Sequence, residues 1–296
     1  MTQFLSLLVN GISLGAVYAL IALGFVIIFK ASEVISFMHG SLILLGAFLI
    51  ARYQTTLGFW AALAIGIVGT TLVALVTERV LIRRLRGAPV ISLAILTIGV
   101  DIILLTQLTR LIGSDILNAG HPWSGQTLRV AGVGITTNRA LAVVVAVVLM
   151  ALFFTAFKFS SWGVAMRAAA EDTETAALMG IRLGRVSMIA WVVAGVLAAV
   201  AGLFLVGSPT PGVTPGVAAV ALRAFPAAIL GGLDSTGGAV VGGLVVGLAE
   251  SFAAGYQDQI LFMGRGFGEV VPYVVMVLVL MVRPSGLFGT RELTRV

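Results

Sequence analysis

Long apolar stretches that carry almost no charge run through this chain, and they limit the folds that it can adopt. Residues 1–29 contain no charged side chain, and several later stretches approach the roughly 20 apolar residues that a helix needs to cross a bilayer. Charged residues make up 10% of the chain, whereas a soluble domain carries about 25%. A soluble fold of 296 residues could not hide so much apolar surface from water. The sequence therefore predicts an all-α fold, a polytopic transmembrane helical bundle that forms one domain over residues 1–296.

The first apolar stretch lacks the basic start and the small-residue cleavage site of a signal peptide, so we interpret it as a retained membrane helix. Segment lengths allow eight to ten spans, and nine is the preferred number. The predicted segments are Phe4–Phe29, Ile35–Ala51, Gly58–Thr77, Val90–Ile112, Ala140–Phe157, Ser187–Val206, Val217–Leu233, Gly237–Ala254 and Val270–Val282.

Arginine and lysine favour the cytoplasmic side of a membrane, and here they gather in Arg79–Arg86, Lys158–Arg185 and Arg283–Arg295. Placing these three segments inside puts the N-terminus and the loop Gly113–Arg139 outside. The C-terminus is then inside, which agrees with nine crossings.

Two apolar segments are interrupted where a helix is expected to continue, at Ser36–Ser41 and Gly231–Gly238. Irregular backbone within a membrane is found where it lines a watery cavity or is buried in protein, so each break is either part of a substrate path or an ordinary loop. The breaks lie in opposite halves of the chain, which suggests an inverted repeat with the substrate between the halves. The candidate path residues are His39, Gly40, Ser41, Tyr18, Asp101, Asp234 and Ser235.

Two of these candidates have structural alternatives. His39 would otherwise satisfy local backbone groups at the helix break, and Asp101 would otherwise pair with a partner inside the bundle, which is the favoured role for it. Glycines spaced four apart, such as Gly11 and Gly15, predict close packing between helices.

Several functions are not expected because the chain lacks the residues for them. It has no cysteine and two histidines, and it contains no His-Glu-x-x-His, Gly-x-Ser-x-Gly or phosphate-loop motif. The sequence therefore predicts no enzymatic activity, no metal site and no nucleotide site. The net charge of +6 is spread over short loops rather than a soluble basic module, so nucleic-acid binding is not expected. Active transport would draw its energy from an ion gradient or from another subunit.

The charged loop 158–186 is predicted to contain a helix over Ala168–Met179, which Gly180 ends. Acidic residues near the start of this helix suit the helix dipole. Such a helix on the cytoplasmic face is either a docking element for a soluble partner or a solvated loop helix, and the residues alone favour neither.

Several segments of the chain resemble those of one transporter family. Glu174–Gly180 is similar to the Glu-Ala-Ala-x-x-x-Gly loop of bacterial ATP-binding-cassette (ABC) importer permeases, with Thr175 where that pattern has Ala. The resemblance to the branched-chain amino-acid permease family of the LivH type extends over nearly the whole chain. The segments that carry it are Asn10–Gly24, Ile35–Ser41, Ala165–Ala168 and Ala227–Gly232.

Membership of that family would imply a multi-pass permease of the bacterial inner membrane. Its partners would be a second, LivM-like permease subunit, two cytoplasmic ABC ATPases and an extracytoplasmic substrate-binding protein. The chain would hold no cofactor, because the partner subunits hydrolyse ATP. The solute would be an amino acid, in the first place a branched-chain one, although relatives carry urea, short amides or other amino acids. The resemblance assigns ATPase coupling to Arg167, Glu171, Glu174, Ala176, Ala177, Leu178 and Gly180.

Two other classes of function stand as alternatives. A secondary carrier driven by an ion gradient would be expected to show more intramembrane carboxylates than Asp101 and Glu250, and no loop for a partner. A structural or assembly protein of the membrane would not need paired broken helices.

Overall fold

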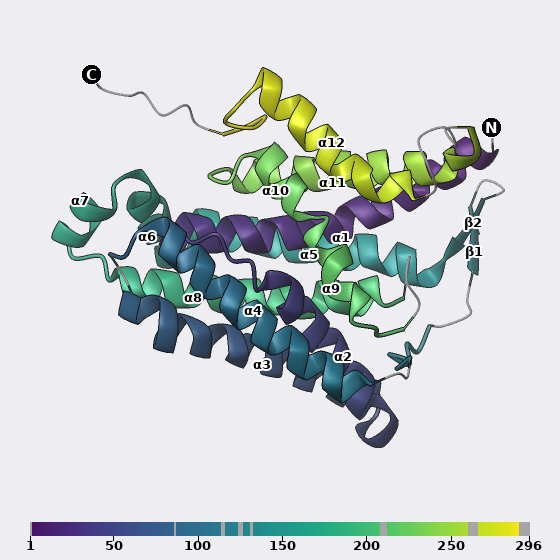
Figure 1. Ribbon diagram of the computed structural model, residues 1–296, viewed down its shortest axis with the longest axis horizontal. Coiled ribbons are helices and arrows are strands. Elements are labelled where there is room, and N and C mark those ends of the chain that lie inside the picture. Colours follow the sequence, from purple (N-terminus) through teal and green to yellow (C-terminus); the bar gives the residue numbers. More distant parts are fainter. Residues whose placement is uncertain are drawn as a thin grey trace.

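The computed structural model describes residues 2–85, 87–113, 116–123, 127–130, 133–207, 212–259 and 266–289. Within these ranges most residues lie in helices that run along one axis, and a two-stranded antiparallel hairpin lies at one end of the bundle (Figure 1). A π-helical turn, Glu78–Ile82, and a 3-10 turn, Arg83–Leu85, extend α3. The elements are α1 (Thr2–Ser32), α2 (His39–Leu57), α3 (Phe59–Thr77), α4 (Val90–Ile112), β1 (Thr127–Val130), β2 (Val133–Thr136), α5 (Thr137–Phe159), α6 (Ser161–Glu171), α7 (Thr173–Leu178), α8 (Leu183–Leu205), α9 (Gly216–Leu222), α10 (Phe225–Gly231), α11 (Thr236–Gly255) and α12 (Phe267–Val282).

Seven helices in the described ranges are long and apolar enough to cross a membrane, namely α1, α2, α3 with its extension, α4, α5, α8 and α11. Two shorter apolar segments, Gly216–Gly231 and Phe267–Val282, bring the total to nine. Helices are the expected solution, because lipid offers no hydrogen-bond partners and each backbone group must be satisfied within the chain. The predicted all-α, multi-span class is confirmed.

The described basic segments gather at one end of the bundle. Arg83 of the α3 extension lines the same hollow as Arg182 and Arg185 at the start of α8. We call this the basic end; it carries α6 and α7, and the opposite end, with β1, β2 and the start of α1, is the hairpin end (Figure 1). The arrangement agrees with the predicted separation of the basic loops from the loop that contains the hairpin. Three of the predicted basic residues lie outside the described part of the chain: Arg86, Arg291 and Arg295.

The helix α1 is the centre of the bundle. In its most apolar stretch 83% of the residues are buried, against 11% in α4 and 17% in α5. Glycines let α11 approach α1 closely, because a Cβ at Gly15 would come to 2.9 Å from the Cα of Leu244, and Gly247 lies against the backbone of Gly15. The glycine spacing thus serves helix packing, as predicted.

The first predicted break, Ser36–Ser41, is present but lies nearer the N-terminus, because His39, Gly40 and Ser41 are already helical. Residues 33–38 leave the helix after α1, and α2 begins only at His39. Thr97 of α4 holds this segment through its hydroxyl, which donates to the carbonyl of Ile35 and accepts from the N–H of Phe37, both at 3.1 Å.

For the second predicted break, the loop interpretation is the one observed. Within Gly231–Gly238, residues 232–235 form a tight turn between α10 and α11, and Ser235 caps α11 by accepting from the N–H of Gly238 at 3.0 Å. The helical span is instead interrupted at residues 223–224, between α9 and α10. The physical reason is Pro226, which has no N–H to continue a helix and is favoured in the first turn of a new one.

The charged loop also differs from its prediction, because it folds into two helices instead of one. Asp172 has an extended backbone (φ −155°, ψ 105°) that separates α6 from α7. Its side chain caps α7 by accepting from the N–H of Thr175 at 2.9 Å, so a strong capping residue competes with continuation of the helix.

Candidate functional site

The two interrupted spans meet at a cluster of rings that we call the aromatic junction. Its members are Phe25 of α1, Phe37 of the segment 33–38, His39 of α2 and Phe225 of α10. Ring centroids lie 4.6 Å apart for Phe25 and His39, and 5.2 Å apart for Phe25 and Phe225. Phe37 lies 5.7 Å from Phe225. These separations are typical of favourable aromatic packing, so Phe25 of α1 links the start of α2 to α10.

His39 is completely buried within this junction. Its ring fits over α1 where Gly24 has no side chain, since a Cβ there would come to 2.6 Å from Nε2. Neither ring nitrogen has a hydrogen-bond partner in the described part of the chain. The ring therefore does not satisfy local backbone groups, which was the structural alternative for this residue.

Gly40 and Ser41 follow His39 in the first turn of α2, and both are buried. A Cβ at Gly40 would come to 3.0 Å from the carbonyl oxygen of Ala218 in α9, so glycine lets the two interrupted spans approach. The Ser41 hydroxyl donates to the carbonyl of Met38 at 3.0 Å, within its own helix start.

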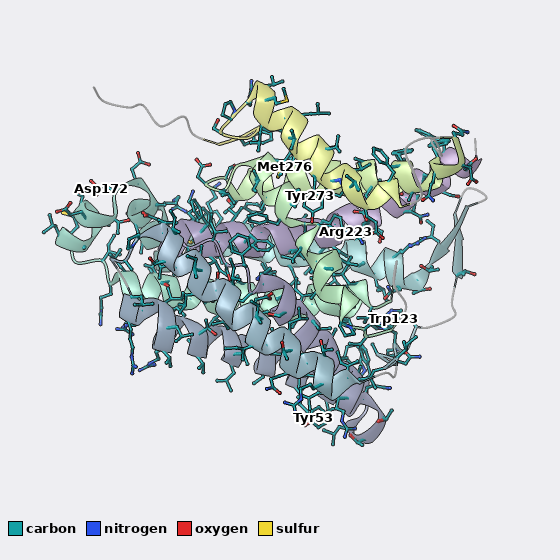
Figure 2. The ribbon with its side chains drawn as sticks, viewed as in Figure 1. Tyr53, Trp123, Asp172, Arg223, Tyr273 and Met276 are labelled. Atoms are coloured by element: carbon teal, nitrogen blue, oxygen red, sulfur yellow. The ribbon has the colours of Figure 1, made fainter. Side chains whose placement is uncertain are left out.

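Tyr18 belongs to a largely buried polar network that links four parts of the chain. Its hydroxyl donates to Oε2 of Glu250 in α11 at 2.8 Å, and Oε1 of Glu250 pairs with Arg223 at 3.2 Å. Arg223 also pairs with Glu269 of α12 at 2.8 Å. Arg223 lies at the break between α9 and α10, near the middle of the bundle in Figure 2. The network therefore fixes this break against α1, α11 and α12.

The other predicted path residues lie elsewhere. Asp101 is a partly exposed residue of α4, and the described residues show no hydrogen bond or ion pair for it. Asp234 and Ser235 lie in the turn before α11, where the carbonyl of Asp234 accepts from Nζ of Lys30 at 2.8 Å. Lys30 is in the last turn of α1, so this turn belongs to the basic end rather than to the aromatic junction.

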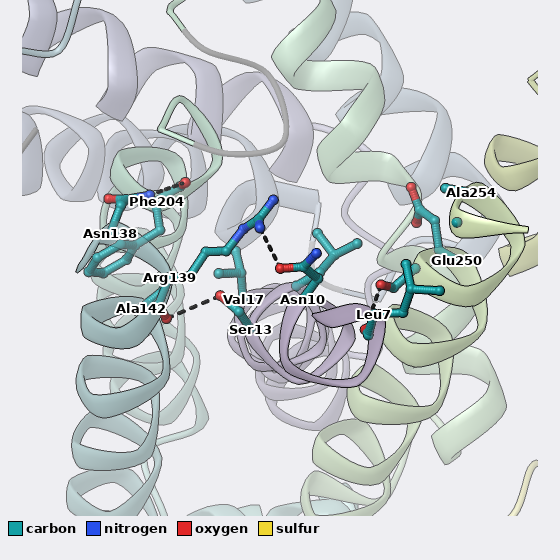
Figure 3. A pocket seen from close by; sticks show the side chains of 13 residues that line it. Leu7, Asn10, Ser13, Val17, Asn138, Arg139, Ala142, Phe204, Glu250 and Ala254 are labelled. Carbon is teal, nitrogen blue, oxygen red and sulfur yellow. Dashed lines mark hydrogen bonds between the residues drawn. The ribbon is translucent and has the colours of Figure 1, made fainter. Parts of the chain in front are cut away.

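Two cavities lie at opposite ends of the molecule. The outer cavity, at the hairpin end, has a volume of about 330 Å³ and lies between α1, α5, α8 and α11 (Figure 3). The inner cavity, at the basic end, has a volume of about 340 Å³ and is lined by the end of α1, the starts of α4 and α8, and α6 and α7.

The inner cavity connects the charged loop with the broken span. Thr173, the first residue of α7, lies 3.5 Å from Oε1 of Glu33, and both residues line the cavity. Glu33 begins the segment 33–38 with a left-handed backbone (φ 55°) that is uncommon for a residue with a side chain. The start of α7 thus lies beside the segment that leads to His39.

The helix α7 is short but capped at both ends, and Figure 2 shows Asp172 at the tip of the basic end. Asp172 accepts from the hydroxyl of Thr175 at 2.6 Å as well as from its N–H, and these bonds hold the pKa of Asp172 below its usual value. Gly180 ends the helix with φ +85°, as predicted. The N–H groups of Gly180 and Ile181 bond to the carbonyls of Ala177 and Ala176, at 3.0 Å each, which is the pattern of a Schellman C-cap.

The predicted coupling residues divide by exposure. Leu178 is 82% exposed, and Met179, which caps α7 directly after it, is 80% exposed, so the end of α7 presents two apolar side chains to its surroundings. Glu174 is also exposed, whereas Ala176 is buried under the helix. Isolated exposed apolar residues are ordinary, but an adjacent pair on a rigidly capped projecting helix is typical of a docking element.

Of the other coupling residues, Ala177 and Glu171 are exposed. Arg167 donates to the carbonyl of Phe157, and its guanidinium lies 5.2 Å from the ring centroid of Phe157. Arg167 therefore braces α6 against the end of α5, which is a role in supporting the loop.

Near the hairpin end, His121 stacks on Trp123 with ring centroids 5.6 Å apart, and burial lowers the pKa of His121. No group of histidine, aspartate or glutamate side chains that could hold a metal ion occurs within the described ranges.

The charged residues of the polar network could be recognised in the sequence, but the pairs that they form could not. Arg223 and Glu250 stand out as charges in apolar segments, but their pairing joins residues far apart in the chain and cannot be derived from one sequence. The polar lining of the outer cavity, with Asn10 and Arg139, was missed as well. Arg139 was a detectable signal, because it immediately precedes a predicted span.

Comparison with known proteins places this geometry in context. Residues 7–280 match the family described as "Branched-chain amino acid transport system / permease component". The chain is 32% identical to the high-affinity branched-chain amino acid transport system permease protein LivH of Escherichia coli (strain K12), over 99% of this chain and 98% of that protein. It is also 32% identical to the permease protein BraD of Pseudomonas aeruginosa, with the same coverage. The probable permease protein LivH of Methanocaldococcus jannaschii is 28% identical over 91% of this chain and 88% of that one.

Among solved structures, a chain of PsaBC from Streptococcus pneumoniae in complex with Fab has a similar fold. The TM-score is 0.54 at 15% sequence identity, and the match covers 96% of this chain and 93% of that one. At this identity the likeness shows a shared fold alone.

Proposed function

Because this chain belongs to the family of branched-chain amino acid transport permease components, we propose that it is the permease subunit of an ABC importer that brings branched-chain amino acids across the bacterial inner membrane. The observation that carries this proposal is the 32% identity to LivH of Escherichia coli, which covers 99% of this chain and 98% of that protein. The match therefore includes the segments of this chain that contain the helix breaks and the charged loop.

The proposed complex contains a second permease subunit, two cytoplasmic ATPases and an extracytoplasmic binding protein. The capped helix α7 supports the ATPase part of this assignment, because Leu178 and Met179 offer exposed apolar contact and Met adapts to irregular surfaces. The basic end faces the cytoplasm in this assignment, in agreement with the positive-inside rule. The chain itself holds no cofactor, and ATP is hydrolysed on the partner subunits.

In the proposed transport cycle, the amino acid enters the outer cavity from the binding protein. The aromatic junction then separates the outer cavity from the inner one. ATP-driven movement of the partner acts on α7, and the contact between Thr173 and Glu33 passes that movement to the start of α2. His39 and Gly40 lie at this start, so they control the passage without contributing chemistry.

The test is uptake of radiolabelled leucine by vesicles that contain the purified complex, with ATP trapped inside and the binding protein outside. We expect uptake that requires hydrolysable ATP, persists when ionophores collapse ion gradients, and is competed by isoleucine and valine but not by urea or acetamide. Uptake that follows an ion gradient without ATP would support a secondary carrier instead. ATP-driven uptake of urea or an amide, without leucine, would contradict the proposed substrate.

A further inference from the structure

The outer cavity combines charge of both signs with an apolar wall. Its volume of about 330 Å³ lies at the small end of the range of roughly 300–1,000 Å³ for small-molecule sites. Residues from both halves of the chain line it, so it is built by the fold rather than by one loop. Its position at the hairpin end, away from α7, is where a solute would enter under the proposed orientation.

The positive side of the cavity comes from α5 and α1. Arg139 begins α5 and donates from Nη1 to Oδ1 of Asn10, and Figure 3 shows both side chains above α1. Ser13, one turn along α1, donates from its hydroxyl to the carbonyl of Arg139 at 3.1 Å. A guanidinium carries five N–H donors in a planar fork, which suits recognition of a carboxylate.

The negative side of the cavity comes from α11, where Glu250 faces the lining from the opposite flank of α1 (Figure 3). Glu250 belongs to the network with Tyr18, Arg223 and Glu269, which sets two carboxylates against one guanidinium. The network has a formal charge of −1, and since Glu269 is 66% exposed and outside the lining, Glu250 is the acidic group that a cation in the cavity would meet. Ser251, next to Glu250, adds a hydroxyl to the same wall.

The remaining wall is apolar. Leu14 and Val17 of α1 and Phe204 of α8 line it, together with Ala142 of α5. Such a surface favours an aliphatic side chain, since burying apolar area releases it from water. A neutral polar solute would gain little from this wall and would not match the opposed charges.

We propose that the outer cavity is a binding site of the permease itself for a zwitterionic α-amino acid with an aliphatic side chain. The Arg139 side receives the carboxylate, the Glu250 side receives the ammonium group, and the Leu14, Val17 and Phe204 wall receives the side chain. The inference rests on the proposed function and adds to it a site that selects amino acids over urea and amides.

The first test is a protection experiment on the assembled complex in vesicles. Ser13→Cys introduces the sole cysteine of this chain into the cavity lining, and Ile12→Cys places one on the neighbouring residue, which is 37% exposed and outside the lining. We expect saturating leucine to slow labelling of the Ser13→Cys protein by a small methanethiosulfonate at least about tenfold. Urea and acetamide should not slow it, and labelling of the Ile12→Cys protein should not respond to leucine.

The second test removes the positive charge. In the Arg139→Gln complex the KM for leucine should rise at least about tenfold, and Arg139→Lys should recover part of the loss. The wild-type complex should prefer leucine over leucinamide, which lacks the carboxylate, and the Arg139→Gln complex should lose that preference. The matched control is Arg110→Gln, because Arg110 is an exposed arginine in the last turn of α4 and does not line the cavity. This substitution should leave the KM unchanged.

The outcomes separate the site from the function. A complex that imports leucine with ATP, but in which leucine protects no cysteine at position 13, would overturn the site and leave the proposed function standing. The same holds if Arg139→Gln leaves both the KM and the preference for leucine over leucinamide intact. A complex with no ATP-driven uptake of leucine would overturn the proposed function and this inference with it.

Discussion

At the scale of single residues, Gly180 decides how α7 ends. Its φ of +85° is in the left-handed region, where a side chain costs about 1–2 kcal/mol and a β-branched one more. We expect Gly180→Val to open the C-cap and to reduce co-purification of the ATPases and substrate-stimulated ATP hydrolysis at least about tenfold. The melting temperature of the membrane bundle should not change, because α7 projects from it.

The control for this variant is Gly237→Val at the same end of the molecule. Gly237 lies in the first turn of α11 without a positive φ, and no neighbouring atom lies within 4 Å of an added Cβ. The Gly237→Val complex should retain full ATPase binding and full stimulation. If the Gly180→Val complex retains both as well, α7 is a solvated connection and the coupling role is wrong.

The pair Asp172 and Thr175 makes a pH-dependent contribution to the same helix. Hydrogen bonds from Thr175 lower the pKa of Asp172 below its ordinary value of 3.8, so the charged cap stabilises α7 above that value. The stabilisation is lost as the pH falls through the lowered pKa, and it is complete at pH 7.

We therefore expect Thr175→Ala, which restores the residue of the family pattern, to raise the pKa of Asp172 towards 3.8 and to leave ATPase stimulation at pH 7 within about twofold of wild type. Asp172→Ala removes the cap itself and should reduce stimulation more. Equal losses from the two substitutions at pH 7 would show that the cap is not what positions α7.

At the scale of elements, the approach of α2 to α9 depends on Gly40. A leucine there would collide with the carbonyl of Ala218, because even a Cβ would reach 3.0 Å. We expect Gly40→Leu to reduce uptake at least about tenfold while the complex remains assembled in the membrane. Gly99→Leu on α4, where an added Cβ meets no atom within 4 Å, is the matched control. Normal uptake by the Gly40→Leu variant would show that the contact between α2 and α9 is not part of the transport path.

The ion pair between Arg223 and Glu250 joins the break between α9 and α10 to α11. Removing one partner of a fully buried pair costs about 3–5 kcal/mol, and the cost here is smaller because Arg223 is partly exposed and also pairs with Glu269. We expect Arg223→Met to lower the melting temperature of the purified protein clearly, and the double variant Arg223→Met/Glu250→Gln to recover most of the loss. Additive losses in the double variant would mean that the two side chains do not stabilise the fold as a pair.

The elements themselves were largely predictable, and their pairings were not. The apolar segments and the break before His39 follow from the local pattern, because lipid demands helices and glycine or polar residues interrupt them. The second break was predicted at the glycine-rich segment Gly231–Gly238 but lies at residues 223–224. Both segments contain residues that interrupt a helix, and the local pattern does not show which one breaks the span. A helix cap at Asp172 split a helix that propensity alone would continue. Contacts such as that of Tyr18 with Glu250 depend on packing between distant helices.

At the scale of the whole molecule, the fold separates two functions along its long axis. The outer cavity lies at the hairpin end, and the capped α7 lies at the basic end. The hairpin and α7 mark these two ends of the molecule in Figure 1. The aromatic junction lies where the two interrupted spans meet. The basic residues gather at the end that carries α7, so in the proposed orientation the charge rule also puts α7 on the side where ATP is available.

The central claim is that this permease meets its ATPase through α7, and a photo-cross-linker at position 179 tests it most directly. Met179 is 80% exposed, so benzoylphenylalanine fits there without disturbing the fold, and Tyr53 near the hairpin end provides a control position. In membranes that contain the whole complex, we predict that irradiation links position 179, but not position 53, to the ABC ATPase subunit as identified by mass spectrometry, and that ATP changes the yield. An assembled, transporting complex in which position 179 forms no adduct with the ATPase would contradict the account.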